Sequence, residues 1–369
     1  MLETIRTGAP ISRAEISRRV GISKPTVSVA LRSLLDAGLV REAARTPDGP
    51  HYGAVYFEPV AERALVLGVD LGARFLRGAV SDLSGAIRAR RDVELDGANA
   101  DTALTAIAEM RDELVEAAGL PAAPIDGLVV GVPGVVEPAG GAVRLALNVP
   151  GLEGRRFGVE LRQRLGVAVT LENDVNLAAL GEQWNGIARG VDDFVFLSVG
   201  TGLGAGVVLN GVLRRGYYGA AGELDYVRAG LALDADPCAA AVSAHTARLA
   251  AEPRVQTSLA PPYDAREVFA AARSGDDLAA SVVAEEARRI ALHVAPIAAV
   301  ADVELVVLGG GIGANGDLLL DPIRSLLDEW LPYPPRIAVS SLGDAAVLTG
   351  AIATGLRSAL ENVFANRAG

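Results

Sequence analysis

Apolar positions near the start of the chain recur every three or four residues. The series within "ISKPTVSVALRSLLDAGLV" consists of Val27, Leu31, Leu34 and Leu35. This spacing predicts a helix with one buried stripe. Ser23 is a favourable N-cap, and Pro25 is tolerated in the first turn because the missing N–H has no partner there anyway. The opposite face of this helix is polar and basic, with Lys24, Thr26, Ser28 and Arg32.

A second helical pattern comes before this helix, and two strand-like runs follow it. In "PISRAEISRRVG", Ser12 stands three residues before Glu15, which is the capping-box spacing. We therefore expect a helix over Arg13–Val20 that ends at Gly21. After Gly38, "LVREAARTPDGPHYGAVYFEP" reads as two strands around a Pro-Asp-Gly turn. Two helices joined by a tight turn and followed by a hairpin predict a winged helix-turn-helix domain over residues 1–60.

A winged helix binds double-stranded DNA by placing the N-terminal residues of its second helix in the major groove. Phosphate contacts from Arg13, Arg18 or Arg45 would fix the register. The alternative is a small dimerisation or lid domain with a solvated charged face. One module of this size rarely binds tightly alone, so we expect a homodimer or homotetramer on a palindromic operator. The DNA contacts that we predict are Ser23, Lys24, Thr26, Ser28, Arg32 and Arg45.

From Leu65 onward, strand-like runs alternate with helical runs, which is typical of an α/β fold. Residues 67–85, "LGVDLGARFLRGAVSDLSG", are two strands joined by a glycine turn, and residues 193–211, "DFVFLSVGTGLGAGVVLNG", repeat this pattern. The repeat predicts two related lobes, over residues 61–178 and 179–369, that face each other across a cleft. Each lobe would contribute one phosphate-binding hairpin.

Charge and composition exclude several classes of protein. The net charge is −11, but residues 1–60 carry eight basic and six acidic side chains (+2), which leaves −11 − 2 = −13 for the rest. This distribution argues against a protein that coats nucleic acid or membrane over its whole surface. The N-terminus has no signal-peptide pattern, and charged residues and a proline interrupt the most apolar stretch, so we expect a cytoplasmic protein without membrane contact. Cys238 is the only cysteine, which excludes a disulfide framework and a cysteine-rich zinc site.

Seven segments follow the winged helix in an order and spacing that resemble a known family. They are "VDLG", "GVPG", "LENDVNLAALGE", "SVGTGLGAGVVLNG", "AGEL", "VVLGGGIG" and "LGDAAVLTGA", and together they extend over nearly the whole chain. With the winged helix, this series resembles the ROK family, whose members are bacterial sugar-responsive repressors and sugar kinases. The resemblance implies an α/β chain in which a two-lobed, actin-like ATPase (ribonuclease H-like) body follows the winged helix.

The resemblance also implies a sugar-binding site. In the family's kinases, the Asp of the Glu-Asn-Asp segment is the general base that takes a proton from the attacking sugar hydroxyl, and this position is Asp174 here. Asn148, Asn173 and Glu223 match positions that hydrogen-bond sugar hydroxyls. The alternative for Asn173 and Asp174 is a simple N-cap of the helix that follows.

The phosphate-binding segments depart from the family's pattern at the first hairpin. The kinases carry Asp-x-Gly-Gly-Thr there, in which glycine lets the backbone approach the phosphates and threonine adds a hydroxyl donor. This chain keeps Asp70 and Gly72 but has Ala73 and Arg74 at the tip. We therefore expect a vestigial nucleotide site, with neither ATP nor Mg²⁺ as a cofactor. The second hairpin is intact and keeps Gly200, Thr201 and Gly202.

The family's zinc-binding segment is changed as well. Its pattern, Gly-Glu-x-Gly-His followed by Cys-x-Cys-Gly-x-x-Gly-Cys, aligns with "GELDYVRAGLALDADPCAA". Asp225 replaces a glycine, Tyr226 replaces the zinc-ligating histidine, and only Cys238 is left of the cysteines. We therefore expect no metal, and we expect Tyr226 to contact the sugar by stacking or through its hydroxyl.

These observations predict a DNA-binding transcriptional regulator of carbohydrate metabolism or transport genes. Among such regulators, a repressor is favoured. A sugar or sugar derivative bound between the lobes would close the cleft and change the spacing of paired winged helices. No catalytic residue is expected in such a protein. The alternative is an ATP-dependent sugar kinase in which Asp174 is the catalytic base.

Overall fold

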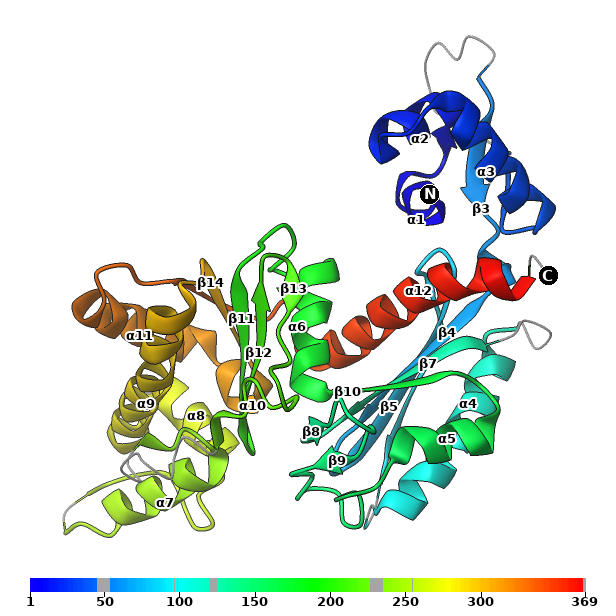
Figure 1. The fold of residues 1–369 in the computed structure, drawn as a ribbon. Helices are drawn as coiled ribbons and strands as arrows, with labels where there is room; N and C mark the ends of the chain where they lie inside the picture. Colours follow the sequence, from blue (N-terminus) through cyan, green and yellow to red (C-terminus); the bar gives the residue numbers. More distant parts are fainter. Residues whose placement is uncertain are drawn as a thin grey trace. The chain divides into compact units, whose positions relative to one another are not determined.

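The computed structural model describes residues 1–44, 54–95, 97, 99–119, 125–225, 235–253 and 255–367 (Figure 1). The chain forms two compact units, and both are discontinuous in sequence. Unit 1 contains Met1–Pro133, Gly140–Glu172 and Ala351–Gly369, and unit 2 contains Gly134–Ala139 and Asn173–Gly350. The last helix, α12 (Ala346–Arg367), therefore begins in unit 2 and belongs to unit 1 for the rest of its length.

Unit 1 begins with the predicted winged helix. Its elements are α1 (Leu2–Gly8), β1 (Ile11–Ser12), α2 (Arg13–Val20), α3 (Lys24–Asp36), β2 (Val40–Glu42) and β3 (Tyr56–Pro59). The bounds expected for the first predicted helix are those of α2, and β2 and β3 pair antiparallel as the hairpin predicted. Helix α1 and strand β1, which pairs with β3, were not predicted. The Pro-Asp-Gly turn lies outside the described residues.

The helix ends of the winged helix follow local rules, with one correction. Gly21 ends α2 at φ 72°, a left-handed conformation that glycine adopts without a Cβ clash. The Ser12 hydroxyl accepts a hydrogen bond from the Glu15 N–H at 3.3 Å. The Glu15 carboxylate, however, pairs with Arg18 and Arg19 and does not return to the Ser12 backbone. The predicted capping box is therefore only half formed.

One apolar core joins the winged helix to the sheet that follows it in unit 1. The predicted stripe is confirmed for Val27, Leu31 and Leu34, whereas Leu35 is only partly buried. The same core contains Leu83, which lies after strand β5 and is fully buried, and Leu360 of α12 packs against it. The winged helix therefore has packing contacts with the rest of unit 1 in addition to its chain connection.

The main sheet of unit 1 has the strand order β10-β7-β4-β5-β6. Strands β4, β5 and β6 are antiparallel neighbours, and β7 runs parallel to β4. Helix α4 (Ala100–Ala117) packs on β5 and β6, and α12 contacts β4 on the opposite face (Figure 1). The strands are β4 (Leu65–Leu71), β5 (Phe75–Asp82), β6 (Ile87–Glu94), β7 (Ile125–Val132) and β10 (Val169–Asn173). Unit 1 also contains the short strand β9 (Val143–Arg144) and helix α5 (Phe157–Leu165), whereas the short strand β8 (Val135–Val136) belongs to unit 2.

Unit 2 repeats this arrangement. Its sheet order is β13-β12-β11-β14-β15, in which three strands are antiparallel neighbours and β14 and β15 continue in parallel. Helix α6 contacts β11 and β12, and the long helix α9 packs with α7, α8 and α11 (Figure 1). The strands are β11 (Phe194–Val199), β12 (Leu203–Leu209), β13 (Val212–Leu213), β14 (Leu305–Gly309) and β15 (Arg336–Val339). The helices are α6 (Asp174–Asn185), α7 (Ala239–Ala250), α8 (Ala265–Arg273), α9 (Asp277–Ala301), α10 (Gly310–Gly313) and α11 (Gly316–Trp330).

The two main sheets confirm the internal repeat that the glycine hairpins predicted. Each has an antiparallel strand pair around a glycine turn, and the first strand of that pair has a parallel neighbour on its other side. The α/β class with an N-terminal winged helix is therefore correct. Among the described residues, no helix is both long enough and apolar enough to cross a membrane.

Candidate DNA-binding and sugar-binding sites

The N-terminal end of α3 presents a polar surface. Ser23 caps the helix: its hydroxyl accepts from the Thr26 N–H at 3.3 Å, and its Oγ lies 2.8 Å from the Thr26 Oγ1. Lys24, Thr26 and Arg32 are exposed, and Ser28 is half-buried. Five of the six predicted DNA contacts thus lie on one helix or at its cap, and four of these five are exposed.

A side-chain hydrogen bond between Arg13 and Ser28 connects α2 to α3. The Ser28 hydroxyl donates to the Lys24 carbonyl oxygen at 2.9 Å and accepts from Arg13 Nη1 at 3.0 Å. These bonds hold Arg13 against α3, and Arg18 pairs with Glu15 on its own helix. Arg45 lies outside the described residues. Ser28 therefore has a structural function in addition to its predicted contact with DNA.

The two basic side chains of α3, Lys24 and Arg32, can bind an external anion. Within the described part of the chain, Lys24 and Arg32 form no ion pair, whereas Arg6, Arg18 and Arg41 each pair with a glutamate. Unpaired cations on an exposed helix are suited to phosphate oxygens, because binding releases the counterions condensed on the DNA.

Asn173 and Asp174 lie where β10 ends and α6 begins. The Asn173 Oδ1 accepts from the Asn176 N–H at 2.9 Å, and its Nδ2 donates to the Gly134 carbonyl oxygen at 3.0 Å. The Asp174 Oδ1 accepts from the Val175 N–H at 2.8 Å. Asn173 is therefore the N-cap of α6, as its alternative interpretation held. Both side chains are half-buried rather than enclosed.

The other predicted sugar contacts are spread over both units. Asn148 lies in unit 1, in an exposed turn, whereas Asn173, Asp174 and Glu223 lie in unit 2. Burial raises the pKa of the Glu223 carboxyl above its usual value, and the negative charge of Asp225 raises it further. Tyr226 lies outside the described residues. The ionised carboxylate accepts hydrogen bonds from sugar hydroxyls.

The loop that carries Glu223 is attached to the second hairpin. Gly222 has φ 90° and lies so close to β12 that a Cβ there would be 1.8 Å from the Ala205 carbonyl oxygen. The Asp225 Oδ1 accepts from the Leu203 N–H at 3.0 Å and lies 3.9 Å from the Cys238 Sγ. The position of Glu223 therefore depends on backbone contacts that only glycine permits and on Asp225.

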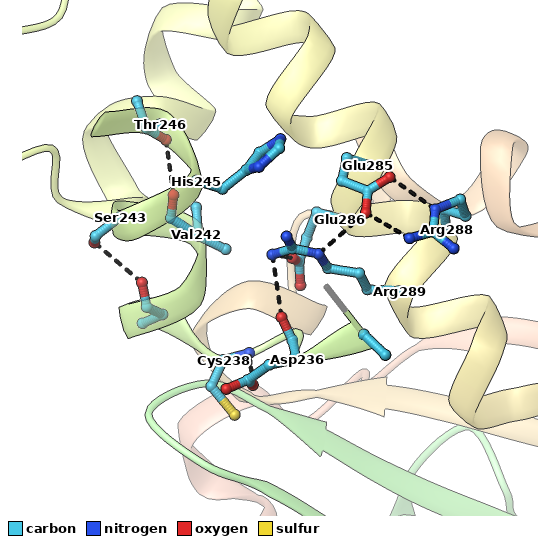
Figure 2. Close-up of polar contacts among 12 residues, drawn as sticks. Asp236, Cys238, Val242, Ser243, His245, Thr246, Glu285, Glu286, Arg288 and Arg289 are labelled. Carbon is cyan, nitrogen blue, oxygen red and sulfur yellow. Dashed lines mark hydrogen bonds and ion pairs between the residues drawn. The ribbon is translucent and has the colours of Figure 1, made fainter. Parts of the chain in front are cut away.

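Polar side chains of α9 hold the segment that leads into α7 (Figure 2). Arg289 Nη1 donates to the Asp236 carbonyl oxygen at 3.1 Å, and His293 Nε2 lies 3.0 Å from the Ala235 carbonyl oxygen. The Asp236 carboxylate in turn accepts from the Cys238 N–H at 2.9 Å. The sequence analysis did not predict these contacts of Arg289 and His293. A charged residue and a histidine within an otherwise apolar helix are the signal that could have indicated them, because such side chains are buried only with polar partners.

Glu286 is the second charged group of this cluster. Its side chain is about 1% exposed, and neither carboxylate oxygen has a hydrogen-bond partner among the described residues. Arg289 Nη1 lies 4.0 Å from Glu286 Oε2, while Arg289 Nε lies 3.3 Å from the Glu285 carboxylate. Burial raises the pKa of Glu286 well above its usual value, against the smaller opposite effect of the Arg289 charge.

This region does not fit the zinc of the resembled family. Cys238 is buried next to Asp225, and the described residues contain no group of three or more His, Cys, Asp or Glu side chains that could hold a metal ion. Structural zinc needs four ligands, mostly thiolates and imidazoles. Here, hydrogen bonds from α9 hold Ala235 and Asp236, the residues that lead into α7.

The first hairpin is also a poor fit for Mg-ATP. Asp70 is buried, and its Oδ2 accepts from Arg77 Nη1 at 3.2 Å, across the β4–β5 pair in which the two residues are opposite each other. Arg77 also lies over the Phe75 ring, 5.2 Å from its centroid. Arg74 pairs with Glu94 at 2.7 Å. The carboxylate is thus engaged by a cation of the chain, and the tip has no hydroxyl donor.

The second hairpin keeps a glycine-rich tip. The Gly200 N–H donates to the Gly202 carbonyl oxygen at 3.0 Å, and the Gly200 carbonyl oxygen accepts from Ala239 at 2.8 Å. Thr201 is exposed between them. These bonds connect the hairpin to the start of α7, so the glycines have a structural function that does not require a nucleotide.

The fold and the candidate sites define a class: a DNA-binding winged helix joined to an actin-like body of two repeated sheets. The comparisons with known proteins are consistent with this class. The chain belongs to the ROK family, whose model matches residues 66–357, and the MarR family model matches residues 1–49.

Repressors and sugar kinases are both among the proteins with similar sequences. A xylose repressor from Caldicellulosiruptor bescii is 27% identical over 96% of this chain and 93% of its own length. A glucokinase from Thermotoga maritima is 33% identical over 72% of this chain and 88% of its own. The crystal structure of a ROK family transcriptional regulator, a homologue of the E. coli MLC protein, covers 100% of this chain and 96% of its own with a TM-score of 0.83. At 22% identity, that likeness shows the fold.

Proposed function

We propose that this protein is a sugar-responsive transcriptional repressor that binds operator DNA through α3, and that it is not a sugar kinase. The observation that carries this proposal is the winged helix, in which the exposed Lys24 and Arg32 form no ion pair with any described residue, in a chain that matches a xylose repressor over nearly its whole length. The changed first hairpin, where Arg77 engages Asp70, supports the non-enzymatic function.

The sugar contacts that we propose are Asn173, Asp174 and Glu223 of unit 2, together with Asn148 of unit 1 and Tyr226. Several polar groups directed at hydroxyls give strong selectivity, because a wrong sugar leaves some of them unpaired. An effector changes the operator affinity only as far as it binds one conformation of the protein more tightly than the other. The effector is a sugar or sugar derivative, and xylose is the first candidate because of the relative's name.

We further propose that the repressor acts as a homodimer or homotetramer in the cytoplasm, on an operator with two half-sites. A single winged-helix module buries only about 600–1,000 Å² on DNA, which is small for a specific complex. Pairing two modules on a palindrome doubles the contact and fixes the spacing of the half-sites.

Thermal unfolding of the purified protein with a panel of sugars and sugar phosphates, each with and without Mg-ATP, tests the sugar half of the proposal. A ligand at one hundred times its Kd stabilises the protein by about 2.7 kcal/mol, which raises Tm measurably. We expect one sugar to raise Tm, no further rise with Mg-ATP, and no ADP release. Sugar-dependent ADP release that Asp174→Asn abolishes would show a kinase instead.

The DNA half is tested with Arg32→Ala. Arg32 is exposed and forms no ion pair among the described residues, so we expect the variant to fold. We expect operator affinity to fall by roughly five- to tenfold, with a shallower salt dependence, because one phosphate contact is lost. The Kd for the sugar should not change. An equal loss of both affinities would contradict the separation of the two functions.

A further inference from the structure

One apolar side chain on α3 faces solvent. Val29 is 70% exposed, whereas the other valine of this helix, Val27, is fully buried. Val29 follows Thr26 by three residues and precedes Arg32 by three, so the three residues share one face of the helix. The Val29 isopropyl group is therefore accessible to a partner that binds this face of the helix.

Charge indicates the kind of partner. The same surface of α3 carries Lys24 and Arg32, which form no ion pair within the described residues, and residues 1–60 have a net charge of +2 in a chain of −11. An apolar protein surface would leave these cations buried without counter-charges. A DNA duplex supplies phosphates for the cations and, in the floor of its major groove, one apolar group: the C5 methyl of thymine.

We infer that Val29 reads a thymine of the operator, by packing its isopropyl group against the C5 methyl. This inference rests on the proposed function and names the base chemistry that α3 recognises. Val29 is the sixth residue of α3, in its second turn, and the N-terminal part of a recognition helix is the part that reaches the base edges. The valine side chain donates and accepts no hydrogen bond, and thymine differs from uracil only by the C5 methyl group, so a contact with Val29 would distinguish these two bases through that methyl.

The contribution is measurable because it depends on one methyl group. Removing one methyl-sized group from an apolar contact costs about a fourfold loss of affinity. Replacing thymine by deoxyuridine removes that methyl and leaves the base pair and its hydrogen-bonding pattern unchanged. Val29→Ala removes the protein side of the same contact. Val29 is exposed and alanine is the better helix former, so we expect this variant to fold.

The experiment uses the full chain. A duplex is first selected from a random pool with the wild-type protein, and each thymine is then replaced in turn by deoxyuridine, with Kd measured by fluorescence anisotropy at one salt concentration. We expect one position per half-site at which deoxyuridine weakens wild-type binding about fourfold. Val29→Ala should bind the thymine duplex more weakly and should not distinguish the two bases at that position. Val212→Ala, which changes a 54% exposed valine of unit 2, should behave as wild type.

Three results would count against these claims in different ways. If the wild-type protein selects no duplex, the proposed function fails together with the inference. If it selects one but no single deoxyuridine weakens binding, then DNA binding stands and the thymine contact is refuted. The contact is also refuted if Val29→Ala keeps the wild-type sensitivity to deoxyuridine.

Discussion

Arg289→Met removes the guanidinium that connects α9 to the segment before α7. The Arg289 side chain is 4% exposed and donates to the Asp236 carbonyl oxygen at 3.1 Å. Methionine preserves most of the apolar stem, so the loss is mainly polar. A buried carbonyl left without its donor costs about 1–3 kcal/mol. Breaking a buried ion pair by removing one partner costs about 3–5 kcal/mol in total, and Glu286 is that second partner here.

The cost should depend on pH, because Glu286 can take up a proton. Its pKa is already raised by burial, and loss of the Arg289 charge raises it further. At pH 5.5 the carboxyl is protonated more easily and the missing counter-charge matters less. We therefore expect a loss of unfolding free energy of about 3 kcal/mol at pH 8 and a smaller loss at pH 5.5.

Arg288→Met is the matched control on the same helix. Arg288 is 39% exposed and pairs with Glu285 near the surface, so its removal should cost less than about 1 kcal/mol. The assay is urea unfolding of the full chain at both pH values, with the sugar-induced rise in Tm as a second readout. Equal losses for the two variants would refute the view that Arg289 anchors this segment. So would a loss for Arg289→Met that is larger at pH 5.5 than at pH 8.

Two further predictions test the buried acid and the attachment of the winged helix. The pKa of Glu286 is raised in the folded state, so the contribution of this residue to stability falls as pH rises through that pKa. Glu286→Gln should therefore raise Tm more at pH 8 than at pH 5.5. A Tm difference between variant and wild type that is the same at both pH values would contradict this. Leu83→Ala should cost about 3 kcal/mol, because it opens a cavity in the core shared with the winged helix, and should speed proteolysis between the winged helix and the sheet. Ile87→Ala, at a half-exposed position of the same hairpin, should cost less than about 1 kcal/mol, and equal effects would show that the winged helix is only tethered.

Local signals predicted the two main helices of the winged helix and the repeated hairpins, but not every element. Ser23 and Gly21 mark helix ends through their own backbone and side-chain preferences, which act over three or four residues. The two glycine hairpins with flanking alternation predicted strand pairs, and the order of the segments predicted the family. Residues in α1 and β6 were missed because their exposed or mixed positions give no clear apolar period.

The tertiary structure decided which partners the buried charged residues have. The pairing of Asp70 with Arg77 depends on the register of β4 against β5, and Arg289 meets Asp236 across 53 residues of sequence. The α12 residues from Ala351 onward belong to unit 1, although they follow unit 2 in the chain. A sequence pattern records which residues prefer a helix, a strand or a turn. The partner of a buried charge depends on which distant segments the packing brings within about 4 Å, and neighbouring residues carry no information about that.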